Sequence, residues 1–348
     1  MKNLLQKAWL SRGWLPWLLL PLAWVHGLAV NARRQLYRVG LFKSERFPVA
    51  VVVVGNVVAG GAGKTPLVIA LATHLQARGH HVGVVSRGHG RSSGDTLEVG
   101  TDTPVEMSGD EPALIKRAIA APVFVASKRA DAVRALLAVY PHTAVVLCDD
   151  GLQHYALQRD IEIAAFDDRG IGNGWLLPAG PLREALPASV PARSLVLYNA
   201  HAASTRLPGN LAARSLAGAV ELAAWRAGQA ASIATLESLR GKPLAAVAGV
   251  ARPNRFFEML REQGLQISAL PLPDHFDFAT LPWPADTPDV VLTEKDAVKL
   301  DPERAGATRV WVVALDFALP AAFEESLLAL LPAAPKPAPG IAHGNQTA

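Results

Sequence analysis

The sequence predicts an α/β protein built on a doubly wound, mainly parallel sheet. Apolar β-branched runs alternate with segments of helical periodicity along most of the chain, and these runs are continuous, as in strands buried on both faces. Half of the 348 residues are hydrophobic and one is cysteine. This composition excludes a disordered chain and an internal disulfide framework, and the length allows a large core with a smaller second α/β lobe.

The expected elements follow one another in chain order. Residues 48–55 form the first buried strand, and residues 65–78 form a helix closed by Gly79. Further strands are expected at 82–85, 123–126, 144–148, 161–166, 194–198, 244–248, 290–293 and 310–314, and further helices at 111–120, 128–139 and 254–263. We therefore divide the chain into an N-terminal segment (1–47), a core (48–200), a second lobe (201–331) and a flexible, proline-rich tail (332–348).

Basic charge is concentrated at the N-terminus. Residues 1–48 hold eight Lys or Arg and one acid, a net charge of +7, whereas the other 300 residues carry 26 basic and 29 acidic groups. Within this segment, residues 14–30 include 13 apolar residues of 17, with tryptophan and arginine at the flanks. Aromatic rings and cations at the ends of an apolar stretch are typical of membrane interfaces.

Three interpretations of this segment remain. Its basic start fits a cleaved signal peptide, and its apolar content fits a buried core helix. The third interpretation is a membrane anchor that either lies in the interface or is just long enough to span the bilayer. The stretch is shorter than the ~20 residues of a spanning helix, and prolines interrupt it. We favour the anchor, with the arginines that follow it keeping the next domain cytoplasmic. Because the body is slightly acidic, the overall positive charge does not indicate a nucleic-acid partner.

A glycine-rich loop follows the first strand. Residues 55–66 read Gly-Asn-Val-Val-Ala-Gly-Gly-Ala-Gly-Lys-Thr-Pro and lead into the first helix. Such a loop binds phosphates through its backbone N–H groups, so Lys64 is expected at the β- and γ-phosphates and Thr65 at Mg²⁺. Val58 stands where the strict pattern has glycine. The alternative, a glycine-rich turn without function, fits the strand and helix context poorly. The fold is therefore expected to resemble that of P-loop NTPases.

A second buried strand ends in Asp149 and Asp150. A carboxylate at the carboxyl end of a strand beside a phosphate loop is a typical Mg²⁺ ligand. Either aspartate is the candidate, and an ordinary Asp-Asp-Gly turn is the structural alternative. Gln153 and His154 lie one turn further on, where contact with a substrate is possible, although His154 alone is equally compatible with a surface position.

Three weaker clusters complete the candidate site. Arg87 follows a strand end, where it can contact a phosphate or lie in a solvated loop. Asp110 opens a helix and is suited to an N-cap. His275 lies in a loop bounded by prolines. The segment 293–296 superficially resembles a guanine-reading motif, but its Lys and Asp are adjacent and no Asp-x-x-Gly follows the acidic strand, so a GTPase is disfavoured.

Together these segments resemble the tetraacyldisaccharide 4'-kinase family, the lipid A 4'-kinases. The resemblance includes the Trp-rich start and covers nearly the whole chain, thinning at 200–240 and after 315. Its most specific strings are Asp-Asp-Gly-Leu-Gln-His and Pro-Ala-Gly-Pro-Leu-Arg-Glu. The matching segments are 56–66, 86–90, 109–112, 149–154, 172–184 and 293–299.

The resemblance implies an ATP-dependent lipid kinase at the cytoplasmic face of the inner membrane. It implies transfer of the γ-phosphoryl group of ATP to the 4'-hydroxyl of tetraacyldisaccharide 1-phosphate, with Mg²⁺, a lipid substrate, a membrane surface and no obligate protein partner. It also implies a catalytic pair, Asp110 and His275, and Lys64 is the third catalytic candidate through its contact with the phosphates. The ATP-binding residues would be Val58, Ala59, Gly60, Gly61, Ala62, Gly63, Lys64 and Thr65.

Two functions of other classes remain as alternatives. The phosphate loop also resembles the variant loop of membrane-binding ATPase switches, but those carry a signature lysine where this chain has Ala59. A nucleotide-binding scaffold without catalysis is the other alternative, and it conflicts with the intact Lys64-Thr65 and the acidic strand end.

Overall fold

The first strand organises the larger lobe. In β1 (Ala50–Gly55), Val52 and Val54 pack toward the face covered by α3 (Lys64–Ala77), α5 (Asp110–Ala118) and α11 (Ala321–Leu330). Val51 and Val53 pack toward the opposite face, which α6 (Arg129–Val139) covers. Burial on both faces explains why the run is continuously apolar. The computed structural model describes residues 2–332, so nearly all of the expected flexible tail (332–348) lies outside the described residues.

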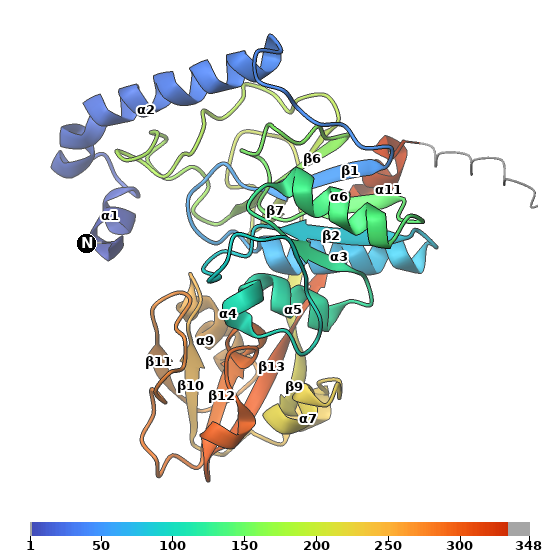
Figure 1. The fold of residues 1–348 in the computed structure, drawn as a ribbon. Helices are drawn as coiled ribbons and strands as arrows, with labels where there is room; N and C mark the ends of the chain where they lie inside the picture. The colour runs from blue at the N-terminus through green and yellow to red at the C-terminus, as the bar shows by residue number, and fades with distance from the viewer. Residues whose placement is uncertain (1, 333–348) are drawn as a thin grey trace, which may run out of the picture.

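The larger sheet has eight strands in the order β3-β4-β2-β5-β1-β6-β7-β8. The pair β3–β4 is antiparallel and the remaining neighbours are parallel. Helices lie on both faces, as a doubly wound sheet requires (Figure 1). Its other elements are β2 (Val82–Ser86), β3 (Leu97–Glu98), β4 (Val123–Val125), β5 (Val145–Cys148), β6 (Ile161–Asp167), β7 (Ser194–Asn199), β8 (Asn210–Leu211), α3 (Lys64–Ala77), α4 (Val105–Ser108), α5 (Asp110–Ala118), α6 (Arg129–Val139) and α11 (Ala321–Leu330).

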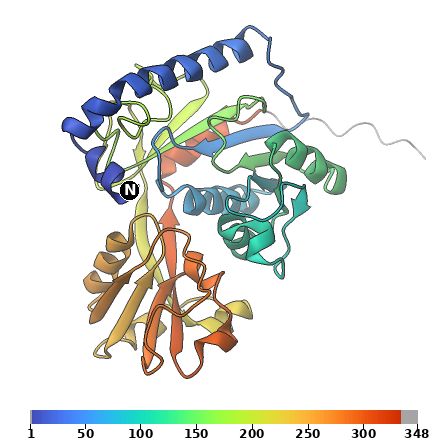
Figure 2. The same cartoon turned by 60° about the vertical axis from the view of Figure 1, so that its left-hand side comes forward.

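The second lobe is a five-stranded sheet in the order β11-β10-β12-β13-β9, with β9 antiparallel to β13. It lies below the larger lobe in the view of Figure 2. Its elements are β9 (Ala213–Glu221), α7 (Leu222–Arg226), α8 (Ile233–Glu237), β10 (Leu244–Ala248), α9 (Pro253–Glu262), β11 (Ile267–Pro271), β12 (Asp289–Thr293), α10 (Glu294–Ala297), the 3₁₀ helix η1 (Pro302–Ala305) and β13 (Arg309–Ala318).

The limits of this lobe differ from the expected 201–331. Strand β8 still pairs with β7 in the larger sheet, and α11 returns to bury Phe323 and Leu327 in the core of the larger lobe. The chain therefore crosses between the lobes twice, near residue 212 and near residue 319. Hydrophobic periodicity indicates that a helix is amphipathic but not which sheet it covers, so the return of α11 was not predictable from its pattern.

The N-terminal segment forms two helices, α1 (Lys2–Ala8) and α2 (Trp14–Arg38). Helix α2 lies across the top of the larger lobe in Figure 1, and α1 lies at the left below the beginning of α2. Helix α2 is long and apolar enough to cross a membrane. Trp14 is 77% exposed and Leu28 71%, and the buried residues of the helix are Pro16 and Ala23. The interpretation of this segment as a buried core helix is therefore wrong.

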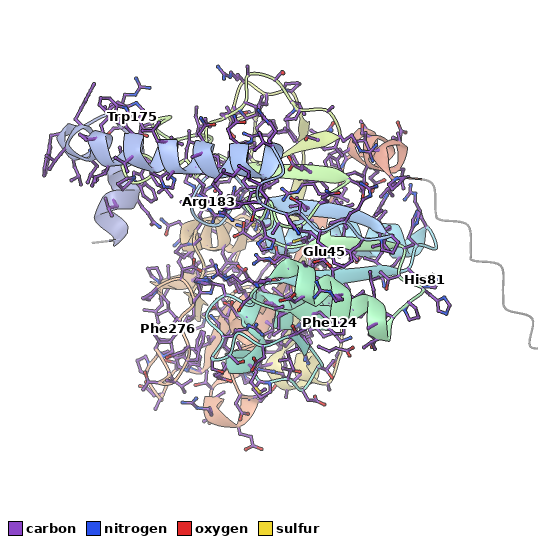
Figure 3. The ribbon with its side chains drawn as sticks, turned by 45° about the horizontal axis from the view of Figure 1, so that its top comes forward. Glu45, His81, Phe124, Trp175, Arg183 and Phe276 are labelled. Carbon is purple, nitrogen blue, oxygen red and sulfur yellow. The ribbon has the colours of Figure 1, made fainter. Side chains whose placement is uncertain are left out.

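The N-terminal helices are fixed to the body by the loop that follows β6. The Trp9 indole donates a hydrogen bond to the Pro178 carbonyl at 2.8 Å, and the Trp17 ring packs edge-on against Trp175 with centroids 4.9 Å apart. Figure 3 shows Trp175 beside α2. These contacts place the segment within the folded body, which favours a retained helix over a removed signal peptide.

Candidate active site

The phosphate loop joins β1 to α3, as expected. Gly60 and Gly63 have positive φ of 102° and 78°, and a Cβ on Gly63 would lie 2.1 Å from the Asn199 side chain, so glycine is required there. The Asn56 amide donates to the Gly60 carbonyl at 3.0 Å and closes the loop. The first turn of α3 therefore faces the loop with its free N–H groups, the arrangement that binds phosphate.

Val58 and Ala59 connect the phosphate loop to the protein core, whereas the glycines that follow allow its tight turn. The Val58 side chain is buried and its backbone bridges to Leu182, while the Ala59 N–H donates to the Pro181 carbonyl at 2.7 Å. A valine replaces the first glycine because this position packs into the core. The Ala59 N–H is already paired, so the loop presents its phosphate-facing donors from Gly60 onward.

Lys64 is buried at the base of this loop. Its ammonium lies 3.4 Å from the Asn56 side-chain oxygen and 3.7 Å from an Asp150 oxygen. Asp150 also accepts a hydrogen bond from Arg183 at 3.1 Å. Burial opposes ionisation of Asp150, but Lys64 and Arg183 outweigh it, so its pKa is lowered. Lys64 is held beside the site where the terminal phosphates of a nucleotide would bind.

Asp149 is in the opposite electrostatic situation. Its Oδ2 accepts from the Ser86 hydroxyl at 3.3 Å, and its buried Oδ1 has no partner among the described residues. Burial and the nearby charges of Glu111 and Asp150 raise the pKa of Asp149 to about 7. A buried carboxylate oxygen without a partner is a costly arrangement that a cation would relieve.

The residues present fit a magnesium ion. The described residues contain no cluster of three His, Cys, Asp or Glu side chains, but Mg²⁺ bound with a nucleotide needs only one or two protein ligands besides phosphates and water. The Thr65 hydroxyl in the first turn of α3 and the free Asp149 oxygen are suitable donors. Asp150 is occupied by Lys64 and Arg183, which leaves Asp149 as the better ligand.

Asp110 and His275 meet across the junction of the two lobes. Nδ1 of His275 lies 2.8 Å from Oδ2 of Asp110, although 165 positions separate them in sequence. The hydrogen bond to Asp110 is the main cause of a raised His275 pKa. Burial would raise the pKa of Asp110, but His275 and Lys295 outweigh it and lower the value to about 2. An ionised carboxylate therefore orients a basic imidazole.

His275 is held in an unusual backbone conformation. Its φ is 65°, which is uncommon for a residue other than glycine, and its N–H donates to the Gly249 carbonyl at 3.2 Å. The expected N-cap role of Asp110 is wrong, because Gly109 is the N-cap of α5 and Asp110 is the first residue inside the helix. Its Oδ1 accepts a hydrogen bond only from the adjacent Glu111 N–H at 2.9 Å, which leaves Oδ2 for His275.

Ten of the predicted site residues line one cleft of about 1100 Å³. They come from the phosphate loop, from the ends of β2 and β5, and from the second lobe. They are Ala59, Gly60, Gly61, Lys64, Arg87, Asp149, Asp150, Gln153, His154 and His275. Trp9 and Arg33 of the N-terminal segment line the same cleft, which therefore reaches from the phosphate loop to the exposed apolar helix.

Gln153 and His154 differ in their surroundings. The Gln153 side chain donates to the Asn56 carbonyl at 3.2 Å and accepts from Arg183 at 3.2 Å, so it supports the phosphate loop. Burial and nearby arginines lower the pKa of His154 to about 4, which leaves its imidazole neutral at pH 7.

Two residues that belong to this site were not predicted from the sequence. Arg183 binds Asp150 and lies below α2 in Figure 3. Lys295 lies within 4 Å of Asp110, Glu111 and Asp274. The signals were the strings Pro-Leu-Arg-Glu and Thr-Glu-Lys-Asp, but a charged residue within a string does not reveal which side chain it meets.

A second cavity of about 200 Å³ lies beside the phosphate loop. Gly63, Thr65 and Pro66 line one side, and Phe256 and Met259 of α9 line the other. Charged residues of both signs line both cavities, and Lys64 lines both. The small cavity differs by the apolar side chains of α9, whereas the larger cleft contains Asp149 and Asp150.

Comparison with known proteins places this geometry in a family. The Tetraacyldisaccharide-1-P 4'-kinase family model matches residues 15–332. Two relatives called tetraacyldisaccharide 4'-kinase are similar over almost their entire lengths. The one from Polaromonas sp. is 56% identical and covers 98% of this chain and 100% of its own, and the one from Leptothrix cholodnii is 52% identical and covers 94% and 96%.

A crystal structure of LpxK from Aquifex aeolicus in complex with ATP has the same fold. It matches with a TM-score of 0.72 and 24% identity over 91% of this chain and 99% of that one. The α/β fold predicted from the sequence is confirmed by this match and by the two sheets. The phosphate loop, the paired carboxylates and the two-lobed architecture thus occur together in a chain that belongs to the Tetraacyldisaccharide-1-P 4'-kinase family.

Proposed function

We propose that the chain transfers the γ-phosphoryl group of ATP to the 4'-hydroxyl of tetraacyldisaccharide 1-phosphate, a step of lipid A biosynthesis that forms lipid IVA. Family membership supports the reaction. The observation that carries the assignment of roles is that His275, oriented by Asp110, opens into the same cleft as Lys64. A base and a phosphate-binding lysine in one cleft fit phosphoryl transfer to a hydroxyl.

His275 acts as the general base in this proposal. Because Nδ1 donates its hydrogen to Asp110, the lone pair on Nε2 is free to accept the proton of the 4'-hydroxyl. The sugar oxygen forms its bond to the γ-phosphorus as the bond between that phosphorus and the β–γ bridging oxygen breaks, and ADP leaves. Asp110 is ionised at neutral pH and stabilises the imidazolium that results.

The phosphate loop positions the donor. Lys64 would leave its contact with Asp150 to pair with β- and γ-phosphate oxygens, which carry the charge of the transition state. Thr65 and Asp149 would hold Mg²⁺, which supplies neutralisation of phosphate charge when it is bound. The small cavity beside the loop is suited to the nucleoside of ATP, because it adjoins the phosphate site and contains apolar side chains.

We further propose that α2 holds the protein at the cytoplasmic face of the inner membrane. Trp14, Trp17 and Trp24 are each more than half exposed, as are several leucines of the same helix. Such a surface is stable in a lipid interface and unfavourable in water. Because Trp9 and Arg33 line the cleft, an acceptor held in the bilayer by its acyl chains can enter beside the helix that contacts the same bilayer.

A transfer assay tests this function directly. Detergent-solubilised protein, incubated with γ-labelled ATP, Mg²⁺ and tetraacyldisaccharide 1-phosphate, should convert the lipid into a labelled bisphosphorylated product. Hydrolysis of ATP that is stimulated by vesicles but leaves the lipid unlabelled would instead support the ATPase-switch alternative and would contradict the kinase.

A further inference from the structure

We propose that Lys295 is a positioning residue that holds the Asp110–His275 pair together across the junction of the two lobes. Its ammonium lies 3.7 Å from Asp110 Oδ2, 3.2 Å from Glu111 Oε1 and 3.5 Å from Asp274 Oδ1. Asp110 and Glu111 begin α5 of the larger lobe, whereas Asp274 precedes His275 in the second lobe. One cation therefore joins acids from both lobes. The inference rests on the proposed role of His275 as the base.

The three carboxylates need a cation between them. Asp110 is 5% exposed and Lys295 is 17% exposed, so water screens their charges weakly. Burial alone would lower the pKa of Lys295, but Glu111, Asp110 and Asp274 together raise it above its ordinary value. Lys295 is therefore charged at every pH at which an enzyme works. Without it, three acids from two lobes would repel one another at the point where the pair must meet.

The backbone that carries His275 is fixed by the same helix. Asp296, the residue after Lys295, is fully buried and accepts hydrogen bonds from the Gly249 N–H at 3.0 Å and from Lys299 at 3.0 Å. The Gly249 carbonyl accepts from the His275 N–H at 3.2 Å. A continuous set of hydrogen bonds thus runs from α10 through Gly249 to the backbone of His275. Helix α10 therefore supports the His275 backbone through Asp296 and contacts the Asp110 carboxylate through Lys295.

The charge of Lys295 also sets how readily His275 takes up a proton. The groups that face the imidazole are Asp110 from α5, Asp274 at 3.7 Å from Nε2, Lys295 from α10, and His89, whose ring centroid lies 5.5 Å away in the loop after β2. The acids raise the His275 pKa and Lys295 lowers it. Removing the lysine charge leaves the acids unopposed, so the His275 pKa should rise further.

Neutral and charge-preserving substitutions of Lys295 separate this role from a purely structural one. In Lys295→Met, the imidazole of His275 should titrate at higher pH than in the wild type, measured by ¹H–¹⁵N NMR on the full-length protein in detergent. The acidic limb of kcat/KM for lipid phosphorylation should move in the same direction, kcat should fall on the order of tenfold, and the KM for ATP should stay close to the wild-type value. In Lys295→Arg, which keeps the positive charge, both the acidic limb of the kcat/KM profile and the pH at which His275 titrates should return to their wild-type values.

Two further variants complete the design. Lys295→Gln, which keeps a hydrogen bond to Glu111 without the charge, should behave as Lys295→Met and serves if the methionine variant does not fold. Lys242→Met removes a cation of the same lobe that lies over the Trp311 ring, on the far side of the sheet. It should change neither the His275 titration nor the pH profile of kcat/KM.

Several outcomes would overturn the inference. An unchanged His275 titration in a folded neutral variant would do so, as would a failure of Lys295→Arg to restore it. A selective rise in the KM for ATP without a shift of the titration would instead assign Lys295 to nucleotide binding. Because the NMR titration needs no substrate, it decides the role of Lys295 even if the wild-type protein phosphorylates no lipid, an outcome that would contradict the proposed function alone.

Discussion

Asp149 and Asp150 are adjacent in sequence but have opposite environments. Asp150 has a left-handed backbone (φ 45°), and its carboxylate contacts Lys64 and Arg183, whereas Asp149 lies in the core with one free oxygen. The sequence left both as candidate metal ligands because an Asp-Asp pair does not show which side chain points inward. The distinction depends on Arg183, which reaches the pair from a loop 33 residues away.

Substitution of these aspartates should separate their roles. Asp149→Asn should raise the Mg²⁺ concentration needed for half-maximal rate about tenfold or more, because a charged ligand is lost. Asp150→Asn should lower kcat, because Lys64 and Arg183 lose their anchor, and should leave the Mg²⁺ requirement near that of the wild type. A Mg²⁺ titration of the transfer rate at saturating ATP measures both. The reverse pattern would move the metal to Asp150.

The Asp110–His275 pair predicts the pH dependence of the reaction. Activity requires a neutral imidazole, and hydrogen bonding to Asp110 raises the His275 pKa, so kcat/KM should fall as the pH drops through that raised value. In Asp110→Asn the negative charge is lost and the His275 pKa falls. The acidic limb should therefore move to lower pH, and the rate should drop on the order of 100-fold or more because the imidazole is less basic and less well oriented.

A matched control for this prediction is Asp102→Asn. Asp102 is an exposed acid in the same lobe, so Asp102→Asn should change neither the acidic limb of the kcat/KM profile nor the rate of phosphoryl transfer. If Asp110→Asn also kept the wild-type limb, the pair would hold the lobes together without acting in proton transfer.

The loop after β6 joins the N-terminal helices to the phosphate site. Its Asn173 side chain donates to the Ser11 carbonyl at 3.2 Å and to the Ala179 carbonyl at 2.9 Å, and near its end Arg183 binds Asp150. His26 of α2 contacts the Arg183 carbonyl at 3.2 Å. The exposed apolar helix α2 and the arginine that binds Asp150 are therefore parts of one packed unit.

The exposed face of α2 should determine membrane binding. In the triple variant Leu18→Ser, Leu22→Ser and Val25→Ser, three exposed apolar side chains one or two turns apart are lost. Because each contributes roughly 1–2 kcal/mol when buried in lipid, co-sedimentation with anionic phospholipid vesicles should fall at least tenfold while thermal unfolding stays near the wild type. Serine at Val139, Leu211 and Ile233, which are exposed outside α2, is the control and should leave sedimentation unchanged. Equal binding by both triple variants would place the membrane contact elsewhere.

The sequence predicted the strands that are buried on both faces, but it did not predict strands that are only partly buried. β1, β5 and β12 are continuous apolar runs and were predicted to within one or two residues. Strand β9 has three Ala and one Gly among its nine residues, and β11 is an exposed edge strand that ends in proline, so neither has a strong strand signal. Strand propensity reflects packing against neighbouring side chains. Five of the nine residues of β9 and all five of β11 are not buried, so their sequences are less constrained to be apolar.

At the scale of the molecule, the site exists only because two lobes meet. Lys64, Asp149 and Asp110 come from the larger lobe, and His275 and Lys295 from the second. The phosphate loop could be predicted from local spacing, because its chemistry is contained in a few consecutive residues. The Asp110–His275 pair was predicted only from the family resemblance, because no local sequence rule connects residues 165 positions apart. The role of Lys295 depends on contacts between the two lobes, so the sequence alone did not predict it.

The most direct measurement of this account is the rate of lipid phosphorylation in a single turnover by the wild-type protein and by His275→Ala, at saturating ATP and Mg²⁺. The wild type should form lipid phosphorylated at the 4' position. His275→Ala should bind ATP with near-normal affinity but transfer the phosphoryl group on the order of 100-fold to 10,000-fold more slowly. Equal rates of transfer by the two proteins would contradict the role of His275 as the base.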